Sequence, residues 1–348
     1  MDRIDFRSDT VSWPTPKMRE AMAQARVGDD VYGEDPTVNE LQTLAAQLTG
    51  KEAALFVASG TMGNLVSVLT HCGRGEQVIL GEDAHIFRYE AGGVAALGGV
   101  MPMPLPTDAH GRMMETAVVQ AISPNDAHFP PTRLIAVENS YGSKQGYPLP
   151  PDYFAAIRRI ADAHNLSVHM DGARLFNAAV AQKLPASALT QYVDSVSICL
   201  SKGLCAPVGS IICGSEAFIQ KAHRIRKAVG GGMRQAGILA AAGLVALTEM
   251  VERLHCDHEH AQILAQRLAD IPGIVVNPAD VKTNMVFFAL ADDAADTAVT
   301  IAQKMQASHN VWVGPTGPKT FRAVTHYWIG MPEIDTFVAA LQSALESR

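Results

Sequence analysis

Two apolar runs with a single lysine between them constrain the fold of this chain most strongly. Residues 196–200 and 208–213 have the length and the apolar content of buried strands. Lys202 lies on the turn between them, which also contains Gly203 and Pro207. A lysine at the end of a buried strand is poorly solvated, so we expect its pKa to fall and its neutral amine to be a nucleophile. The alternative is that the Lys202 stem simply carries its charge to water.

The bulk composition is that of a globular enzyme. The 348 residues are 48% hydrophobic and 18% charged, which is enough to bury a sizeable core and to form two domains. The formal net charge is −7, and no run of lysine and arginine forms a basic stripe. We therefore expect neither a nucleic-acid partner nor an anionic membrane partner.

Three features favour a cytoplasmic location. The first seven residues lack the apolar core of a signal peptide. The longest apolar stretch, residues 237–247, is too short to cross a bilayer and is expected to be a core or interface helix. The five cysteines are odd in number and show no CxxC spacing, so we expect them to be reduced and buried.

A predicted strand at residues 53–57 leads through a small polar loop, residues 59–64, into a predicted helix. A strand, a polar loop and a helix N-terminus form the usual arrangement for holding a phosphate, because free N–H groups and the helix dipole both favour its charge. Taken alone this motif is weak, because such turns join many strands to helices. The loop is not a P-loop, because it lacks the Gly-Lys-Ser/Thr ending.

Other predicted strand ends carry acid–base side chains. His85 follows a short strand at residues 78–80, and Asp171 ends the strand at residues 167–171. Lys202 comes one strand after Asp171. An acid that keeps a pyridine nitrogen protonated, a lysine that binds an aldehyde and a phosphate loop are the requirements of pyridoxal 5′-phosphate. The sequence therefore predicts a pyridoxal-phosphate site.

The chain is predicted to form two domains. Residues 1–250 are expected to contain an N-terminal arm and a large cofactor-binding domain, and residues 251–348 a small C-terminal domain with helices and strands. Residues 255–260 are rich in metal-ligand residue types but lack the second ligand pair of a structural zinc site. We interpret them as a solvated helix face and predict no metal site.

Five motifs occur in an order typical of one enzyme family. They are residues 7–10, 28–33, 169–174, 201–204 and 230–235. In these motifs the chain resembles the low-specificity L-threonine aldolases, which are pyridoxal-phosphate enzymes of the aspartate-aminotransferase fold, type I. The resemblance extends to residues 322–326 and so covers nearly the whole chain. It implies an α/β fold, with a large domain around a mostly parallel seven-stranded sheet and a small C-terminal α+β domain.

The resemblance implies a role for each matching residue. Lys202 is similar to the lysine that forms the imine with the cofactor, Asp171 to the partner of the pyridinium nitrogen, and His85 to the histidine that stacks on the ring. The implied phosphate contacts are Gly60, Thr61 and Ser201, with Arg234 and Lys227 reaching the phosphate from a neighbouring subunit. The implied substrate contacts are Ser8, Arg174, Arg322, Tyr89 and Tyr141, of which the arginines suit a carboxylate.

Two positions depart from the family pattern. Tyr141 stands where members commonly carry a histidine, which bears on the preference between threonine and allo-threonine. Cys205 replaces the usual glycine after Lys-Gly-Leu, and we interpret it as a packing variant because a buried thiol is normally inert. His85 is the first candidate base for the β-hydroxyl proton, because imidazole titrates near neutrality, and Tyr141 is the second.

The resemblance implies cleavage of L-threonine, L-allo-threonine and other β-hydroxy-α-amino acids to glycine and an aldehyde. It also implies dimers with shared active sites, often paired into tetramers. Two alternatives on the same scaffold are β-elimination to ammonia and a keto acid, and transfer of the amino group. A non-catalytic pyridoxal-phosphate-binding protein is an alternative of another class, but such a carrier needs no substrate arginines.

Overall fold

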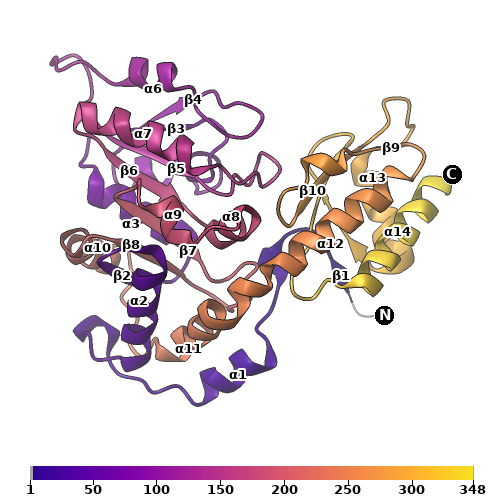
Figure 1. Ribbon diagram of the computed structural model, residues 1–348, viewed down its shortest axis with the longest axis horizontal. Coiled ribbons are helices and arrows are strands. Elements are labelled where there is room, and N and C mark those ends of the chain that lie inside the picture. Colours follow the sequence, from indigo (N-terminus) through magenta and orange to yellow (C-terminus); the bar gives the residue numbers. More distant parts are fainter. Residues whose placement is uncertain (1–2, 348) are drawn as a thin grey trace. The chain divides into compact units, whose positions relative to one another are not determined.

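The structure, a computed structural model, describes residues 3–347, which fall into two units (Figure 1). One unit comprises residues 14–251, and the other comprises residues 252–347 together with the N-terminal residues 3–13. The grouping of residues 3–13 differs from the expected arm of the large domain. These residues join the second unit because β1 (Ile4–Asp5) pairs in parallel with β11 (Val311–Trp312) and the Phe6 ring is buried in its core.

A seven-stranded sheet forms the centre of the unit of residues 14–251 (Figure 1). The strand order is β2-β8-β7-β6-β5-β3-β4, and all pairs are parallel except those of β8 with β2 and β7. The strands are β2 (Ala53–Val57), β3 (Gln77–Gly81), β4 (Met101–Leu105), β5 (Thr132–Glu138), β6 (Ser167–Asp171), β7 (Ser195–Cys199) and β8 (Ser210–Gly214). This is the mostly parallel sheet that the sequence predicts.

The strand register places the candidate residue Asp171 at the edge of the sheet formed by the carboxyl ends of the parallel strands. Glu138 at the end of β5 is level with Asp171 at the end of β6, and Asp171 is level with Ser197 in β7. The strands β2, β3, β5, β6 and β7 run in the same direction, so the loops that follow them all leave from the same edge. This is the edge at which α/β folds gather ligands.

Helices of this unit begin and end at recognisable signals. α2 (Pro36–Thr49) starts at Asp35, whose carboxylate accepts N–H bonds from Thr37 and Val38, and ends at Gly50 in the left-handed region. The other helices are α1 (Pro16–Ala23), α3 (Gly60–His71), α4 (His85–Arg88), α5 (Gly93–Ala96), α6 (Glu115–Ala121), α7 (Pro151–His164), α8 (Leu175–Gln182), α9 (Ala186–Thr190), α10 (Glu216–Ala228) and α11 (Gly237–Val245).

Apolar packing fixes α3 against the sheet. Leu65 and Val68 on α3 are buried in one cluster with Val78, Leu80 and Leu134 from the strands. Burial of a side chain of this size contributes about 1.5–3 kcal/mol to stability. The fixed position of α3 matters for function, because α3 carries both the predicted phosphate loop and Asn64, which contacts Asp171.

Two elements are not evident from local sequence patterns. β4 contains Pro102 and Pro104, which argue against a strand, but as an edge strand it tolerates the missing N–H groups. The apolar stretch at residues 237–247 belongs to a longer helical run, in which a π-helical turn at Ala246–Met250 joins α11 to α12 (Val251–Ala269).

The unit that includes residues 252–347 has an antiparallel four-stranded sheet of order β12-β13-β10-β9. Its remaining elements are β9 (Ile274–Val275), β10 (Met285–Leu290), β12 (Gly314–Pro315), β13 (Thr320–Val324), α13 (Ala298–His309) and α14 (Met331–Glu346). Asp257 in α12 is fully buried and pairs with Arg253 at 2.8 Å, and burial raises the pKa of Asp257 to about 6. The interpretation of residues 255–260 as a wholly solvated face is therefore wrong at Asp257.

Within residues 3–347, no helix combines the length and the apolar content needed to cross a membrane. No disulfide joins the cysteines of the described chain, and the buried ones are Cys72, Cys199, Cys205 and Cys213.

Candidate active site

Asp171 is a buried carboxylate held by two donors at the end of β6. Its Oδ2 accepts a hydrogen bond from the Asn64 Nδ2 at 2.8 Å, and its Oδ1 accepts one from the Ala173 backbone N–H at 3.1 Å. Asn64 lies in the first turns of α3 and is itself buried. The sequence predicts Asp171 as a site residue but assigns no role to Asn64, although Asn64 is the last residue of the predicted phosphate loop.

A hydrogen-bond chain of fixed direction continues from Asn64 into the core. Asn64 Nδ2 faces carboxylates, so its Oδ1 faces His169 Nε2, at 3.2 Å, and that nitrogen must carry the proton. His169 Nδ1 then accepts from the Ser195 hydroxyl at 2.8 Å, which in turn accepts from His71 Nε2 at 2.8 Å. Burial lowers the pKa of His169 to about 3 and that of His71 to about 4, so both rings are neutral. The chain thus presents a donor, and never an acceptor, to Asp171.

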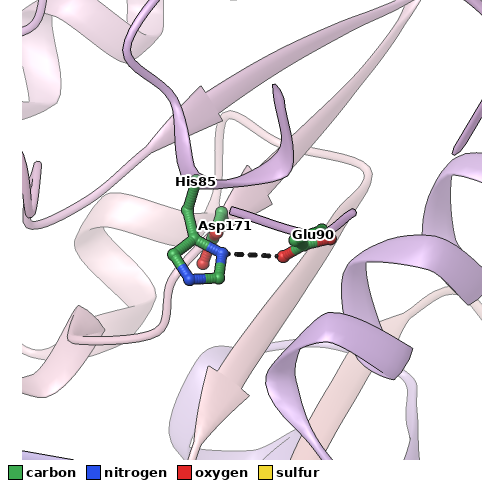
Figure 2. Close-up of side chains that lie close together, drawn as sticks. All are labelled: His85, Glu90 and Asp171. Carbon is green, nitrogen blue, oxygen red and sulfur yellow. Dashed lines mark hydrogen bonds and ion pairs between the residues drawn. The ribbon is translucent and has the colours of Figure 1, made fainter. Parts of the chain in front are cut away.

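His85 is held by two carboxylates that the sequence analysis did not single out. The backbone N–H of His85, the first residue of α4, donates to Glu138 Oε2 at 2.8 Å. Its Nδ1 lies 2.8 Å from Glu90 Oε1 (Figure 2). The same Glu90 oxygen also accepts a hydrogen bond from Asn64 Nδ2 at 2.8 Å. The bond to Glu90 raises the pKa of His85. Asn64 therefore connects the Asp171 carboxylate to the His85–Glu90 pair.

The site concentrates acidic groups in a dry environment. One ligand-type atom from each of His85, Glu90 and Asp171 lies within 4.8 Å of the other two. Burial raises the pKa of Glu90, and burial together with the charge of Asp171 raises the pKa of Glu138 to about 7. We assign no metal to this cluster, because the N–H groups of Asn64 and His85 already engage its carboxylates.

Lys202 and Ser201 follow β7, the strand beside β6. Both residues are half-buried. The positive charge of Lys202 opposes the rise in the pKa of His85, so the two groups are close enough to interact electrostatically. The turn continues to Cys205, whose backbone N–H donates to the Lys202 carbonyl at 2.9 Å. Cys205 is buried with a φ of 64°, in the left-handed region that favours glycine, which explains why a glycine is usual there.

The N-terminus of α3 has the features expected of a phosphate site. Ser59 caps the helix by accepting the Met62 N–H at 3.2 Å. The first N–H groups of a helix have no acceptor within it, so those of Gly60 and Thr61 could bind an anion at this end of α3. A Cβ at Gly60 would lie 2.7 Å from the Cys199 Sγ, so only glycine lets the loop approach the end of β7 this closely.

Tyr141 is packed into the fold. It is 2% exposed, and a side chain at Gly81 or Gly111 would collide with its hydroxyl or its ring. Burial raises the pKa of Tyr141, which disfavours the phenolate that a base would need. Tyr89, by contrast, is 66% exposed, with its ring centroid 5.7 Å from that of His85.

The structure places the other predicted residues as follows. Arg174 is buried at the start of α8. Gly142 lies close to both Arg174 and Glu138, because a Cβ atom added to Gly142 would lie 3.6 Å from Arg174 Nη1 and 3.4 Å from Glu138 Oε1. Arg234 pairs with Asp29 at 3.0 Å, and Lys227 lies in the last turn of α10.

Two predicted substrate contacts, Ser8 and Arg322, belong to the other unit. The Ser8 hydroxyl accepts the Thr10 N–H at 3.2 Å, and Arg322 Nη2 donates to the Arg7 carbonyl at 3.2 Å. The structure thus gathers Lys202, Asp171 and His85 at one sheet edge, and the predicted roles of these three residues and of the others stay predictions.

Known proteins with similar sequences match this chain over nearly their whole length. The sequence profile of the β-eliminating lyase family matches residues 5–291. The chain is 45% identical to low-specificity L-threonine aldolase 1 of Arabidopsis thaliana, covering 99% of this chain and 97% of the relative. It is 46% identical to the low specificity L-threonine aldolase of Escherichia coli K12, covering 93% of each.

Solved structures agree on the fold at lower identity. A threonine aldolase from Leishmania major superposes with a TM-score of 0.82 at 20% identity, covering 98% of this chain and 99% of that one. A serine palmitoyltransferase from Sphingomonas wittichii superposes with a TM-score of 0.75 at 17% identity, covering 98% and 87%. The family match spans most of the chain and the relatives match it nearly end to end, so this chain belongs to the low-specificity L-threonine aldolases within the β-eliminating lyase family.

Proposed function

We propose that this chain is a pyridoxal-phosphate-dependent aldehyde-lyase. It cleaves L-threonine, L-allo-threonine and other β-hydroxy-α-amino acids to glycine and an aldehyde, and catalyses the reverse reaction. The observation that carries the proposal is the meeting of Asp171, His85 and Lys202 at one sheet edge, in a chain 45–46% identical to two curated threonine aldolases.

The residues present fit pyridoxal phosphate. Asp171 is buried with both oxygens engaged by N–H donors, so it is held as the carboxylate that a protonated pyridine nitrogen requires. The α3 N-terminus offers N–H groups that have no acceptor within the helix to the phosphate, and Gly60 lets this loop pack closely against the end of β7. Lys202 supplies the amine for the aldehyde. When bound, the cofactor provides the sink for the electron pair that the breaking Cα–Cβ bond releases.

The chain's own side chains would do the remaining work. Asp171 holds the proton on the pyridine nitrogen, and the neutral rings behind it leave no competing proton acceptor. His85 Nε2 takes the proton from the substrate β-hydroxyl, since the other ring nitrogen is engaged by Glu90. Arg174 and Arg322, with Ser8, bind the substrate carboxylate, for which a guanidinium fork is suited. Tyr89 and Tyr141 complete the proposed substrate contacts.

Products distinguish this function from its alternatives. Cofactor-loaded protein is given L-threonine, L-allo-threonine and L-phenylserine, and glycine, aldehyde, keto acid and ammonia are assayed together, with Lys202→Ala as the control. We expect glycine and aldehyde in equal amounts from the wild type and almost none from the control. Keto acid with ammonia would instead identify a β-eliminating lyase, which the name of the family makes the second candidate. Binding of cofactor without any product would favour a non-catalytic protein.

We further propose a cytoplasmic homo-oligomer, a dimer with shared sites or a tetramer made of two such dimers, acting in threonine breakdown and glycine supply. An apolar groove of about 850 Å³, lined by residues that include Met62, Leu69 and Ile225, supports a subunit contact, as does the 63% exposure of Leu97, which also lines it. Light scattering gives the mass in solution. If Arg234 serves a neighbouring site, mixing Lys202→Ala with Arg234→Ala should restore activity that neither variant has alone.

A further inference from the structure

Glu90 is brought back to His85 by a single helical turn. α4 spans only His85–Arg88, and the Tyr89 N–H donates to the His85 carbonyl at 2.9 Å, which closes the turn and returns the chain beside the His85 ring. The Glu90 side chain is only 2% exposed, whereas that of His85 is 40% exposed. The pair therefore has one partner shielded from water and one partner open to the site.

The hydrogen bonds decide where the His85 proton lies. Glu90 Oε1 receives an N–H from Asn64, so it acts as an acceptor. Imidazole, with an ordinary pKa of about 6.5, is a stronger base than a glutamate carboxylate, at about 4.3, so the proton between them resides on His85 Nδ1. Figure 2 shows Nδ1 directed at Glu90 and the second ring nitrogen directed away from it.

We infer that Glu90 is the positioning residue that keeps the proton of His85 on Nδ1 and leaves Nε2 as the acceptor for the substrate β-hydroxyl proton. This inference rests on the proposed function. When Nε2 takes the proton, the β-hydroxyl oxygen keeps the electron pair that becomes the aldehyde carbonyl as the Cα–Cβ bond breaks. Glu90 stabilises the imidazolium so formed without receiving a proton itself. The same logic governs the buried acid behind the histidine of a catalytic triad.

No other described group is placed to do this for His85. The carboxylate of Glu138 is engaged by the backbone N–H groups of His85 and Gly142. The charge of Asp171 also raises the pKa of His85, but its carboxylate is engaged by Asn64 and by a backbone N–H, and the charge of Lys202 acts in the opposite direction. Glu90 has a spare acceptor besides, because its Oε2 is buried with no partner among the described residues.

The first test reads the tautomer directly. The ring nitrogens of ¹⁵N-histidine-labelled, cofactor-loaded enzyme are observed by NMR, and His85→Asn identifies the His85 signals. We expect neutral His85 to carry its proton on Nδ1, and its pKa to be lower in Glu90→Gln than in the wild type. A wild-type His85 protonated on Nε2, or a pKa that Glu90→Gln leaves unchanged, would overturn the inference. The tautomer is measured in the wild type, so this reading does not depend on how well Glu90→Gln folds.

The second test is kinetic. Removal of a general base's support costs on the order of 100-fold in rate, so kcat for L-threonine should fall by about that factor in Glu90→Gln while KM changes little. The acidic limb of kcat/KM should move to lower pH. Glu82→Gln removes a charge from the same segment and serves as the matched control, with both parameters retained.

A double-mutant cycle separates positioning from general damage. If Glu90 acts through His85, then Glu90→Gln should cause no further loss in a His85→Asn background. An equal loss in both backgrounds would overturn the inference. Absence of aldehyde from the wild type would overturn the proposed function alone, because the tautomer is measured without substrate.

Discussion

Asp171 and His85 lie in one cluster, yet the chain holds them in different ways. Asp171 ends a central strand and is backed by a buried chain of neutral donors that runs through Asn64 and His169. His85 sits on a single helical turn, is partly exposed, and depends on two carboxylates whose pKa values burial raises. The first arrangement suits a charge that must stay constant, and the second suits a group that gains and loses a proton.

The difference separates two tasks. A fixed carboxylate keeps the electronic state of a cofactor unchanged through a catalytic cycle, whereas a base must be protonated and deprotonated in each turnover. Asn64 connects the Asp171 side of the cluster to the His85 side, since its Nδ2 donates to Asp171 and to Glu90. Changes on the two sides should therefore have distinguishable consequences.

The largest effect is expected from Asn64→Leu, which keeps the size of the side chain but removes its amide. It would leave Asp171 Oδ2 and the His169 N–H without their Asn64 partner and take one of two hydrogen bonds from Glu90 Oε1, and each unsatisfied buried group costs about 1–3 kcal/mol. We expect a fall of several kcal/mol in the free energy of unfolding, together with weaker cofactor binding.

Urea denaturation and cofactor titration measure both quantities. The matched control is Asn39→Leu, an exposed asparagine with a single bond to the Gly33 carbonyl, where a change below about 1 kcal/mol is expected. If Asn64→Leu behaved like this control, the Asp171 side would not depend on the hydrogen-bond chain.

A smaller, pH-dependent effect is expected from Glu138→Gln. The folded state raises the pKa of Glu138 to about 7, so between the ordinary value and that pH the folded protein binds more protons than the unfolded chain. Its contribution to stability is therefore complete at low pH and is lost as the pH rises toward 7. Since one pKa unit corresponds to about 1.4 kcal/mol, the decline between pH 5 and pH 8 should be shallower in Glu138→Gln by roughly 2 kcal/mol.

Unfolding curves at several pH values for the wild type, Glu138→Gln and the control Glu82→Gln test this. Parallel pH dependence in all three proteins would show that Glu138 does not titrate in this range and would remove the contrast between the two sides.

Sequence reasoning finds the Asp171 side better than the His85 side, for a physical reason. Apolar runs and their polar ends mark strands, and parallel strands bring their ends to one edge, so Asp171, Lys202 and the α3 loop could be predicted. Glu90 could not, because its approach to His85 depends on a short turn whose geometry leaves no periodic pattern.

For Asn64 and His169 the sequence gives a weaker indication of their place in the site. Each is a polar residue among apolar neighbours and therefore requires a buried partner, but only the structure identifies that partner. Local sequence patterns also do not reveal that β4 is a strand in spite of its prolines, or that the N-terminal arm pairs with residues 311–312.

The most direct test of the account compares two reactions in His85→Asn. Exchange of the glycine α-proton with D₂O needs the cofactor, Asp171 and Lys202 but no base at the β-hydroxyl, whereas cleavage of L-threonine needs that base as well. Both rates are measured on one cofactor-loaded preparation of each protein. Because a general base contributes roughly 10²–10⁴-fold, cleavage should fall by about 100-fold or more in His85→Asn while glycine exchange stays within a few-fold of the wild type. Full cleavage activity in this variant, or an equal loss of both reactions, would contradict the assignment of His85 as the base.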